Sequence, residues 1–320
     1  MSTPSVSVVI ETVTSREDTS TGALADDLEP TLAAIAAQTY PRERIETIVV
    51  LDPDVPAGTA AEIERRHPAV RVVMARAQNY FVAKNAGAAA ATGEIVALLD
   101  GDCVPATDWL ETLVARLGPG IDVVAGCTRY SGTSLAARTF SVPDFAYVLS
   151  EQGNASGILI NNVAFRRDVL LAHPFEERIR RNGGCFLQFH QLRRAGVTVV
   201  YEEKAVVAHG LDIAGLGFVK KHFGRGFDGV AVYRADDGAV LRGTRLFRRA
   251  GALVLPPIYA RRIVIDWVRI FRHRKAIDVS LLTLPYYGAV AVMLRLIEFA
   301  GALTAVVVPA SRMREPEVAS

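Results

Sequence analysis

Two aspartates one residue apart, at the end of an apolar run, are the first candidates for chemistry. The segment reads "ALLDGDCVP" (97–105), in which Asp100 and Asp102 follow a strand-like stretch and a proline ends it. Two carboxylates at positions i and i+2 after a buried strand can converge on one divalent cation, because hard ions prefer oxygen ligands. By itself such a pair is more often a solvated turn, so the surrounding elements must decide between a metal site and a turn.

Short β-branched runs and helical stretches alternate through residues 5–210, and these elements must position the two aspartates. We expect strands at 5–10, 45–52, 70–75 and 94–100, and helices at 27–38, 59–67 and 82–91. This order predicts an α/β fold with a mainly parallel sheet covered by helices on both faces. Ligands of such sheets bind at the carboxyl ends of the strands, where Asp52 and Asp100 lie.

The composition fits a large α/β protein of a reducing compartment. The chain has 320 residues, a formal net charge of +2 and three cysteines without CxxC spacing. The small net charge gives no reason to expect a nucleic-acid partner, and the odd number of cysteines favours a reducing compartment. The N-terminus lacks the basic and apolar regions of a secretory signal, so we expect a cytoplasmic location. A mean hydropathy of +0.23 is high for a freely soluble protein and indicates membrane contact.

The C-terminal region differs in composition from the rest. Residues 242–275 carry ten Lys or Arg against one acid, Asp266, and two charge-free apolar stretches follow at 279–294 and 299–311. Neither stretch reaches the roughly 20 residues that span a bilayer, and Pro285 interrupts the first. We therefore expect an amphipathic helical region, interfacial or re-entrant, on the cytoplasmic face of an anionic membrane. Packing against a second subunit in a homo-oligomer, or in an ordinary core, stays open.

These patterns divide the chain into four parts. We expect a catalytic α/β domain at 1–210, a basic loop or linker at 211–241, membrane-associated helices at 242–311 and a loose tail at 312–320. Within the linker, "FVKKHFGRG" (218–226) places Arg225 between glycines. Such a loop either closes on a diphosphate during turnover or is a solvated surface.

Several blocks follow one another in the order of a known enzyme family. They read "SVSVVIET", "LAAIAAQTYP", "IETIVVLDPD", "VAKNAGAAAATGEIVALLDGDCVPATDWL", "NNVAFRRDVL" and "LRRAGVTVVYEEKAVVAHG". Together they resemble the inverting family 2 glycosyltransferases, whose GT-A fold is a Rossmann-like sheet flanked by helices. The resemblance implies transfer of a sugar from a UDP-, GDP- or dTDP-linked donor to an acceptor hydroxyl.

The resemblance implies a role for each matched position. Asp52 matches the acid that reads the nucleotide base. Lys84 and Asn85 stand where the family has an RN or KN pair near the nucleotide sugar. Asp100 and Asp102 match its DxD motif, in which the first carboxylate usually faces the ribose or sugar and the second ligates Mg²⁺ or Mn²⁺ at the diphosphate.

His209, which closes the last block, matches a histidine that completes the metal shell or contacts the diphosphate in several members. The implied metal ligands are therefore Asp102, His209 and Asp100. The chemistry agrees, because a bound dication stabilises the negative charge that grows on a nucleoside diphosphate leaving group. Manganese tolerates a mixed shell of oxygen and imidazole.

The end of the first strand departs from the family's pattern. Where the family often reads IPTYN, residues 10–14 read "IETVT", so that Thr12 keeps its place and Glu11 is unusual. A carboxylate at this strand end either binds the base or ribose of the donor or is an exposed cap.

The clearest departure concerns the general base, which an inverting transfer needs to take the proton of the acceptor hydroxyl. The family commonly supplies it from an acidic pair shortly before the block matching "LRRAG". That pair falls on Gly184 and Cys185, and no carboxylate stands between Asn182 and Gly196.

Four interpretations of the missing acid stay open. His190 is a candidate base because imidazole titrates near pH 7, and Cys185 is one if its pKa is lowered at a helix start. An acid from another segment is the third, and a chain that binds nucleotide sugar without efficient transfer is the fourth. The acids from other segments are Asp144, Glu151, Glu176 and Glu177.

We therefore expect a metal-dependent inverting glycosyltransferase with a saccharide or glycolipid acceptor, such as a polyprenyl-linked saccharide. The alternative is a catalytically silent, glycosyltransferase-like binding subunit at the membrane. A nucleotidyltransferase is disfavoured, because residues 11–23 lack the glycine-rich basic phosphate loop expected after its first strand.

Overall fold

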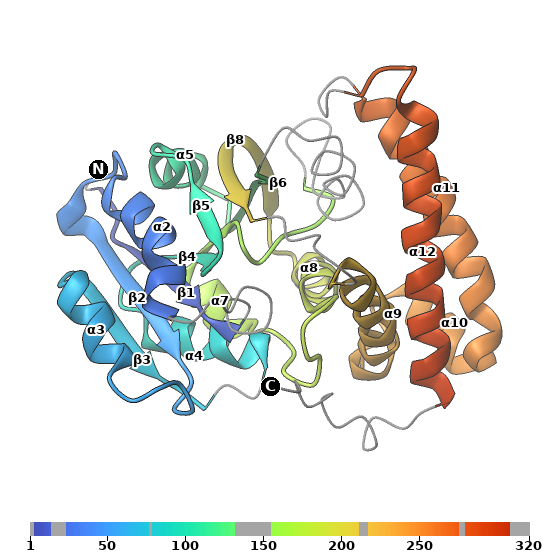
Figure 1. Ribbon diagram of the computed structural model, residues 1–320, viewed down its shortest axis with the longest axis horizontal. Coiled ribbons are helices and arrows are strands. Elements are labelled where there is room, and N and C mark those ends of the chain that lie inside the picture. Colours follow the sequence, from blue (N-terminus) through green and yellow to red (C-terminus); the bar gives the residue numbers. More distant parts are fainter. Residues whose placement is uncertain are drawn as a thin grey trace. The chain divides into compact units, whose positions relative to one another are not determined.

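The chain divides into two compact units (Figure 1). The structure, a computed structural model, describes residues 3–13, 24–76, 79–131, 155–210, 217–274 and 279–307. The first unit comprises Met1–Glu177 and Gln188–Asp212, and the second comprises Arg178–Leu187 and Ile213–Ser320. Helix α8 (Gly184–Arg194) begins in the second unit and continues into the first.

The first unit is built on one eight-stranded sheet with the strand order β3-β2-β1-β4-β7-β6-β8-β5. Strands β3, β2, β1 and β4 are mutually parallel, as are β6 and β8, whereas β7 and β5 run antiparallel to their neighbours. The strand bounds are β1 (Val6–Glu11), β2 (Ile45–Leu51), β3 (Val70–Met74), β4 (Ile95–Asp100), β5 (Cys103–Pro105), β6 (Val123–Tyr130), β7 (Val163–Arg166) and β8 (Val199–His209). The predicted mainly parallel α/β sheet is confirmed.

Helices flank this sheet. They are α2 (Leu24–Ala36), α3 (Thr59–Arg66), α4 (Tyr80–Ala90), α5 (Trp109–Arg116) and α7 (Arg167–Ala172), with a 3₁₀ segment η1 (Arg42–Arg44). Helices α2, α3 and α4 correspond to the three predicted helices. Helix α4 begins where the Asn79 side chain accepts hydrogen bonds from the backbone N–H groups of Phe81 and Val82. A Cβ on Gly87 would lie 2.2 Å from Val9 Cγ1, so this glycine lets α4 approach β1 closely.

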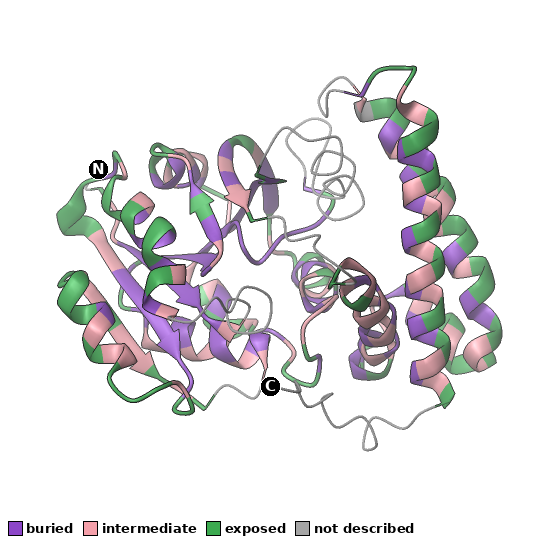
Figure 2. Cartoon of the chain, viewed as in Figure 1, coloured by how far each residue is buried: buried purple, intermediate pink, exposed green. Residues whose placement is uncertain are grey.

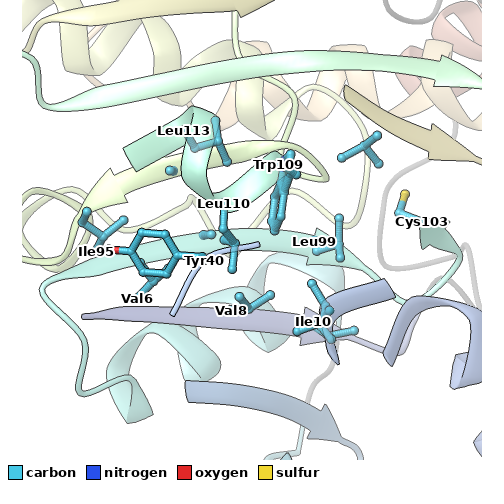
Figure 3. Packing of buried hydrophobic residues seen from close by; sticks show 14 of the residues in the cluster. Val6, Val8, Ile10, Tyr40, Ile95, Leu99, Cys103, Trp109, Leu110 and Leu113 are labelled. Carbon is cyan, nitrogen blue, oxygen red and sulfur yellow. The ribbon is translucent and has the colours of Figure 1, made fainter. Parts of the chain in front are cut away.

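The core of the first unit lies between the sheet and helices α2 and α5. Figure 3 shows Trp109 and Leu110 of α5 packing toward Leu99 of β4 and Val8 of β1. The fully buried Trp109 donates its Nε1–H to Asn162 Oδ1 at 2.8 Å, so its polar atom is satisfied. This packing fixes the strand ends that carry the candidate site.

The second unit is helical. Its elements are α9 (Gly217–Ala235), α10 (Arg242–Ala250), the 3₁₀ segment η3 (Gly251–Val254), α11 (Leu255–His273) and α12 (Leu284–Val307). Helices α9 and α12 touch through glycines: a Cβ on Gly226 would lie 1.7 Å from Glu298 O, and one on Gly301 would lie 2.0 Å from Phe223 O. Only residues without side chains permit such a backbone approach.

Two expectations for this region are wrong. Most of the segment predicted as a basic loop forms helix α9, in which Gly226 packs against α12 rather than ending the helix. The two short apolar stretches are joined within one helix of 24 residues, α12, in which Pro285 occupies the second position, where no backbone N–H is needed. By length and hydropathy α12 is long enough to cross a membrane. The tail at 312–320 lies outside the described residues.

Charges interrupt the apolar sequence of α12 because they are paired inside the helical unit. Arg295 Nε lies 2.6 Å from Asp266 Oδ2 of α11, and Arg295 Nη1 lies 2.6 Å from Glu298 Oε2. The ring of His222, on α9, lies 3.1 Å from the other Glu298 oxygen. His222, Asp266 and Glu298 are all buried, so this ion network joins three helices at their contact.

Candidate active site

The candidate site lies at the carboxyl edge of the parallel strands. Strands β1 and β4 pair so that their last residues, Glu11 and Asp100, are opposite each other. Asp52 follows Leu51, the last residue of the neighbouring strand β2. The sheet therefore brings acids from three adjacent strands to one edge, where parallel α/β sheets bind ligands.

Helix α4 holds the Asp100 carboxylate in place. Lys84 Nζ lies 2.8 Å from Asp100 Oδ1 and also donates to the carbonyl of Leu99. The Tyr80 hydroxyl donates to Asp100, with distances of 2.7 and 2.9 Å to the two carboxylate oxygens. Tyr80 and Lys84 are one helical turn apart, so both project from the same face of α4. Sequence reasoning missed Tyr80, although its i, i+4 spacing from Lys84 was visible.

Asp102 and His209 lie close to Asp100, and we call these three residues the corner. The short strand β5 pairs antiparallel with β8 so that Cys103 is opposite His209. This pairing places His209 Nε2 3.6 Å from Asp102 Oδ2. Ligand atoms of Asp100, Asp102, Cys103 and His209 all lie within 4.8 Å of one another. The three predicted metal ligands are therefore brought together, with Cys103 as a neighbour that sequence reasoning did not predict.

His209 is oriented for ligation. Its Nδ1 lies 2.7 Å from the carbonyl oxygen of Gly210, an arrangement in which Nδ1 carries the proton and donates. In the neutral ring this leaves the lone pair on Nε2, the nitrogen that faces Asp102. The edge of the ring also packs against Tyr130, with 5.5 Å between ring centroids, which restricts its rotation.

The donor set fits a hard or borderline divalent cation. Metal–oxygen bonds of about 2.0–2.6 Å place two ligands of one ion at most about 5 Å apart, which agrees with the spacing of this corner. Burial, together with the nearby Asp102 and Asp100, holds the pKa of the Cys103 thiol well above its usual range. The raised pKa disfavours the thiolate, and the carboxylate and imidazole groups are the ligands that suit Mg²⁺ or Mn²⁺.

The other predicted donor-binding residues are held by local hydrogen bonds at the same edge. Asp52 Oδ1 accepts from the backbone N–H of Asp54 at 2.9 Å, and Thr12 donates to the carbonyl of Val50. Glu11 accepts from the backbone N–H of Val13 at 2.7 Å and is fully buried. The interpretation of Glu11 as an exposed cap is therefore wrong, because its side chain folds back into the strand end.

Asn85 turns away from the Asp100 corner, since it is the next residue around α4 after Lys84. Its Nδ2 donates to the carbonyl of Phe175 and to Glu177 Oε1, both at 2.9 Å, and its Oδ1 accepts from the Phe175 N–H. These bonds brace residues 175–177 against the helix. One of the candidate bases, Glu177, is thus part of this brace.

Comparison with known proteins relates this chain to an enzyme family. Residues 18–172 match the family model described as Glycosyl transferase family 2. The glycosyltransferase AglE of Haloferax volcanii is 27% identical over 251 residues, covering 73% of this chain and 80% of AglE. The family match, over just under half of the chain, and this curated relative together support a family 2 glycosyltransferase.

Two further comparisons agree with this family. The glucosyl-dolichyl phosphate glucuronosyltransferase of Haloferax volcanii is 26% identical over 213 residues, which cover 58% of this glycosyltransferase and 65% of that protein. The solved mannosyltransferase PcManGT of Pyrobaculum calidifontis, in complex with GDP-Man and Mn²⁺, has a TM-score of 0.64 at 18% identity and covers 95% of this chain and 88% of its own.

GalNAc-T7, solved with UDP, GalNAc and Mn²⁺, has a TM-score of 0.51 at 16% identity. It covers 66% of this glycosyltransferase and 44% of that chain. At these identities both solved structures establish the GT-A-like fold of this chain.

The region of the missing acid pair contains a carboxylate that sequence reasoning did not consider. Cys185 is half-buried in the first turn of α8, and His190, farther along the helix, packs its ring edge-on against Phe189. Two residues before α8, Asn182 donates its backbone N–H and its side-chain amide to Asp228 of α9, at 3.0 and 2.7 Å. Burial raises the pKa of Asp228 above its usual range, although the Asn182 hydrogen bonds oppose this.

The remaining candidates are distributed as follows. Arg225 lies half-buried on α9, in the second unit. Glu176 follows Phe175 in the segment that Asn85 braces. Asp144 and Glu151 lie outside the described residues.

Proposed function

We propose that this family 2 glycosyltransferase transfers a sugar, with inversion and with the help of Mn²⁺ or Mg²⁺, from a nucleotide-sugar donor to a lipid-linked or polysaccharide acceptor. The observation that carries the proposal is the corner formed by Asp100, Asp102 and His209 at the carboxyl edge of the sheet. The complex of PcManGT with GDP-Man and Mn²⁺ supports the same chemistry for this corner.

In this proposal each residue of the edge has a role in one displacement. The acceptor oxygen attacks the anomeric carbon, the bond from that carbon to the donor's phosphate oxygen breaks, and the nucleoside diphosphate leaves with the bonding electrons. Asp102 and His209 would hold the divalent ion, which stabilises the charge of the leaving diphosphate. Asp100 and Asp52 orient the ribose and base of the donor, and the backbone bonds of Asp52 and Thr12 fix the pocket's edge.

The proton of the acceptor hydroxyl must pass to a base, and within the first unit His190, Glu176 and Glu177 are the candidates for that role. Glutamine at each of these positions in turn tests the role: transfer falls at least about a hundredfold in the variant that lacks the base, while donor binding persists. A transfer rate unchanged in a variant excludes that residue as the base.

The donor proposal is tested by thermal unfolding of the full chain with Mn²⁺ and each of UDP, GDP, dTDP and CMP. Metal-dependent stabilisation by one nucleotide is the expected result, because a ligand that binds only the native state raises its melting temperature. Asp102→Asn abolishes the stabilisation, whereas Asp54→Asn, which changes an exposed acid at the same edge, preserves it. No stabilisation by any nucleotide contradicts the proposal.

The departure at Gly184 and Cys185 supports one alternative, a silent binding subunit. Both functions predict nucleotide binding, so turnover must separate them. The enzyme releases the nucleoside diphosphate from its donor, slowly with water and faster with acceptor, and Asp102→Asn stops this release. A chain that binds the donor tightly and releases no diphosphate under any condition is the silent subunit.

We further propose that the helical unit lies on the cytoplasmic face of an anionic membrane. Helix α12 presents to the outside a stripe without any charge, although its other face is buried (Figure 2). The stripe consists of Tyr286, Ala289, Met293, Leu296, Ala300, Leu303 and Val307. A helix whose exposed face carries no charge at all is unusual for a surface in contact with water alone, and such a face indicates a binding surface.

Helix α11 continues this apolar surface. Val264, Trp267, Val268 and Phe271 are 45–61% exposed and follow a helical spacing. A Cβ on Gly288 would lie 2.4 Å from the Trp267 ring, so the two stripes meet where Trp267 packs on α12. The ten basic residues of 242–275 favour an anionic lipid surface over a second copy of the same basic unit.

Sedimentation of the full chain with phosphatidylglycerol vesicles tests this surface. We expect binding that falls with salt, and a large loss of binding in Leu296→Glu, because a charge enters the apolar stripe. Leu171→Glu, at an exposed leucine of the first unit, is the matched control and binds as before. If Leu296→Glu instead converts a stable dimer to a monomer and no vesicle binds either protein, a second copy covers the surface.

A further inference from the structure

The Asp100 carboxylate is neutralised from inside the protein before any ligand arrives. Lys84 Nζ lies 2.8 Å from Asp100 Oδ1, and neither side chain is accessible, with exposed fractions of 0% and 5%. Because water does not reach this pair, the effective dielectric constant around it is low. The electrostatic effect of the ammonium on the corner is therefore only weakly screened. Lys84 offsets one of the two carboxylate charges that the DxD motif brings to the edge.

Besides Asp100, two further contacts keep this ammonium in place. The carbonyl of Leu99 accepts from Lys84 Nζ, and the ammonium lies 5.5 Å from the centroid of the Tyr80 ring. The close approach of α4 to β1 at Gly87, one turn farther along, fixes the distance from the helix to the sheet. Tyr80 in turn donates to the carboxylate, so Asp100 has a fixed orientation as well as a fixed counter-charge.

We propose that Lys84 is an electrostatic positioning residue whose buried charge weakens the corner's affinity for a free divalent ion. The ion is then held firmly only together with the anionic diphosphate of the nucleotide. This inference rests on the proposed function, since it takes the corner as a metal and nucleotide site. Its physical basis is that an ion entering the corner meets one negative charge fewer than the sequence pattern offers, and the diphosphate restores that charge.

Direct titration of Mn²⁺, followed by the electron paramagnetic resonance signal of the free ion, tests the inference on the full chain. Each variant is titrated with Mn²⁺ alone and with Mn²⁺ plus UDP, GDP or dTDP. Lys84→Met binds Mn²⁺ alone at least about tenfold more tightly than the wild type, because a nearby positive charge is removed. Its gain in affinity on adding nucleotide is correspondingly smaller.

The control variants change the charges of Lys84 and Asp100 separately and together. Lys84→Arg keeps the positive charge and binds Mn²⁺ alone like the wild type. Asp100→Asn weakens the binding, and Lys84→Met/Asp100→Asn, which removes both members of the pair, returns it to the wild-type level. A lysine with a merely structural role gives weaker binding, or no change, in every variant that lacks it.

Folded Lys84→Met that binds Mn²⁺ no more tightly than the wild type overturns the inference. If Lys84→Met does not fold, the comparison passes to the double variant, which must bind Mn²⁺ more tightly than Asp100→Asn alone; equal binding overturns the inference. Failure of the proposed function has a different signature, because then the wild type does not bind Mn²⁺ with any of the nucleotides.

Discussion

The two units of this protein each bury charged side chains, but they use them differently. In the helical unit, Arg295 is enclosed by Asp266 and Glu298, and His222 binds the remaining oxygen of Glu298. In the sheet unit, Lys84 binds Asp100, while Asp102 and His209 stand 3.6 Å apart with ligand atoms converging on one point. The helical network is closed on itself, whereas the corner is arranged around a position that a cation fits.

The difference shows how the surroundings of a carboxylate decide its use. Glu298 is fixed between helices that only pack together, so its charge contributes to stability and helix register. Asp102 lies at the end of a strand, where the neighbouring strand β8 brings an imidazole within reach. We therefore expect changes at the first network to affect folding and, under the proposed function, changes at the corner to affect ligand binding and turnover.

The largest expected effect is on folding of the helical unit. Arg295→Met leaves Asp266 and Glu298 buried without their shared cation, which costs about 3–5 kcal/mol of unfolding free energy. Hydrogen exchange of the α12 amides measures this loss. Arg65→Met, at an exposed ion pair of α3, is the control and leaves exchange unchanged. Unchanged exchange in Arg295→Met contradicts the structural role of the network.

The next effect is on turnover and leaves folding intact. Asp102→Asn lowers kcat by about a hundred- to a thousandfold, or about 2.7–4 kcal/mol in the barrier, because the leaving diphosphate loses its charge stabilisation. Release of nucleoside diphosphate measures it, with Asp54→Asn as the control at an exposed acid. If Asp102→Asn unfolds the protein instead, the corner serves to stabilise the fold, as the helical network does, and the distinction between the two is wrong.

Low pH is expected to destabilise the helical unit through protonation of Glu298. Burial raises the pKa of Glu298, but Arg295, His222 and Arg262 outweigh burial and lower it from 4.5 to about 2. Because the folded pKa lies below the unfolded value, the ionised carboxylate stabilises the fold above pH 4.5, and about 3 kcal/mol is lost as the pH falls from 4.5 to 2. Exchange of α12 amides across this range measures the loss.

An acid at the surface provides the control for this pH dependence. Arg65 and Arg66 lower the pKa of Glu62 to about 2 as well, yet the Glu62 side chain is partly exposed and solvent screens its ion pairs. Glu62→Gln therefore leaves the acid sensitivity of α12 unchanged. An α12 whose exchange does not accelerate between pH 4.5 and 2 contradicts the assignment of Glu298.

The smallest effect concerns the helix contact that encloses the network. Gly226→Ala places a Cβ against the backbone of Glu298 and destabilises the helical unit by about 1–3 kcal/mol. Gly224→Ala, on the same helix, has nothing within 4 Å of its new Cβ and stabilises the helix by about 0.5–1 kcal/mol. Urea unfolding of the two variants measures both signs, and equal effects contradict the contact.

The first unit could be predicted well because its local patterns agree with its fold. The strands that end at Leu51 and Asp100 are continuous apolar runs, and such runs in alternation with helices indicate a parallel sheet. The shared carboxyl edge of that sheet follows from the topology, so Asp52, Asp100 and Asp102 were predicted at one site. The roles of these residues stay proposals.

The second unit could not be predicted in the same way, because its partners lie far apart in the sequence. Glycines in α9 and charges in α12 resemble helix breaks when each is considered alone. In the structure Gly226 packs against the backbone of Glu298, and Arg295 donates a hydrogen bond to Asp266 of α11. The contacts that hold these helices together join residues 29 to 76 positions apart in the sequence.

By itself the sequence determined the α/β fold, the family, and the edge at which Asp100 and Asp102 stand, since these follow from local periodicity and motif order. Only the tertiary structure decided that Lys84 and Tyr80 hold Asp100, that His209 reaches Asp102, and that α12 is continuous. The physical reason is that a buried charge is tolerated only beside its partner, and the partner is chosen by packing rather than by neighbouring residues.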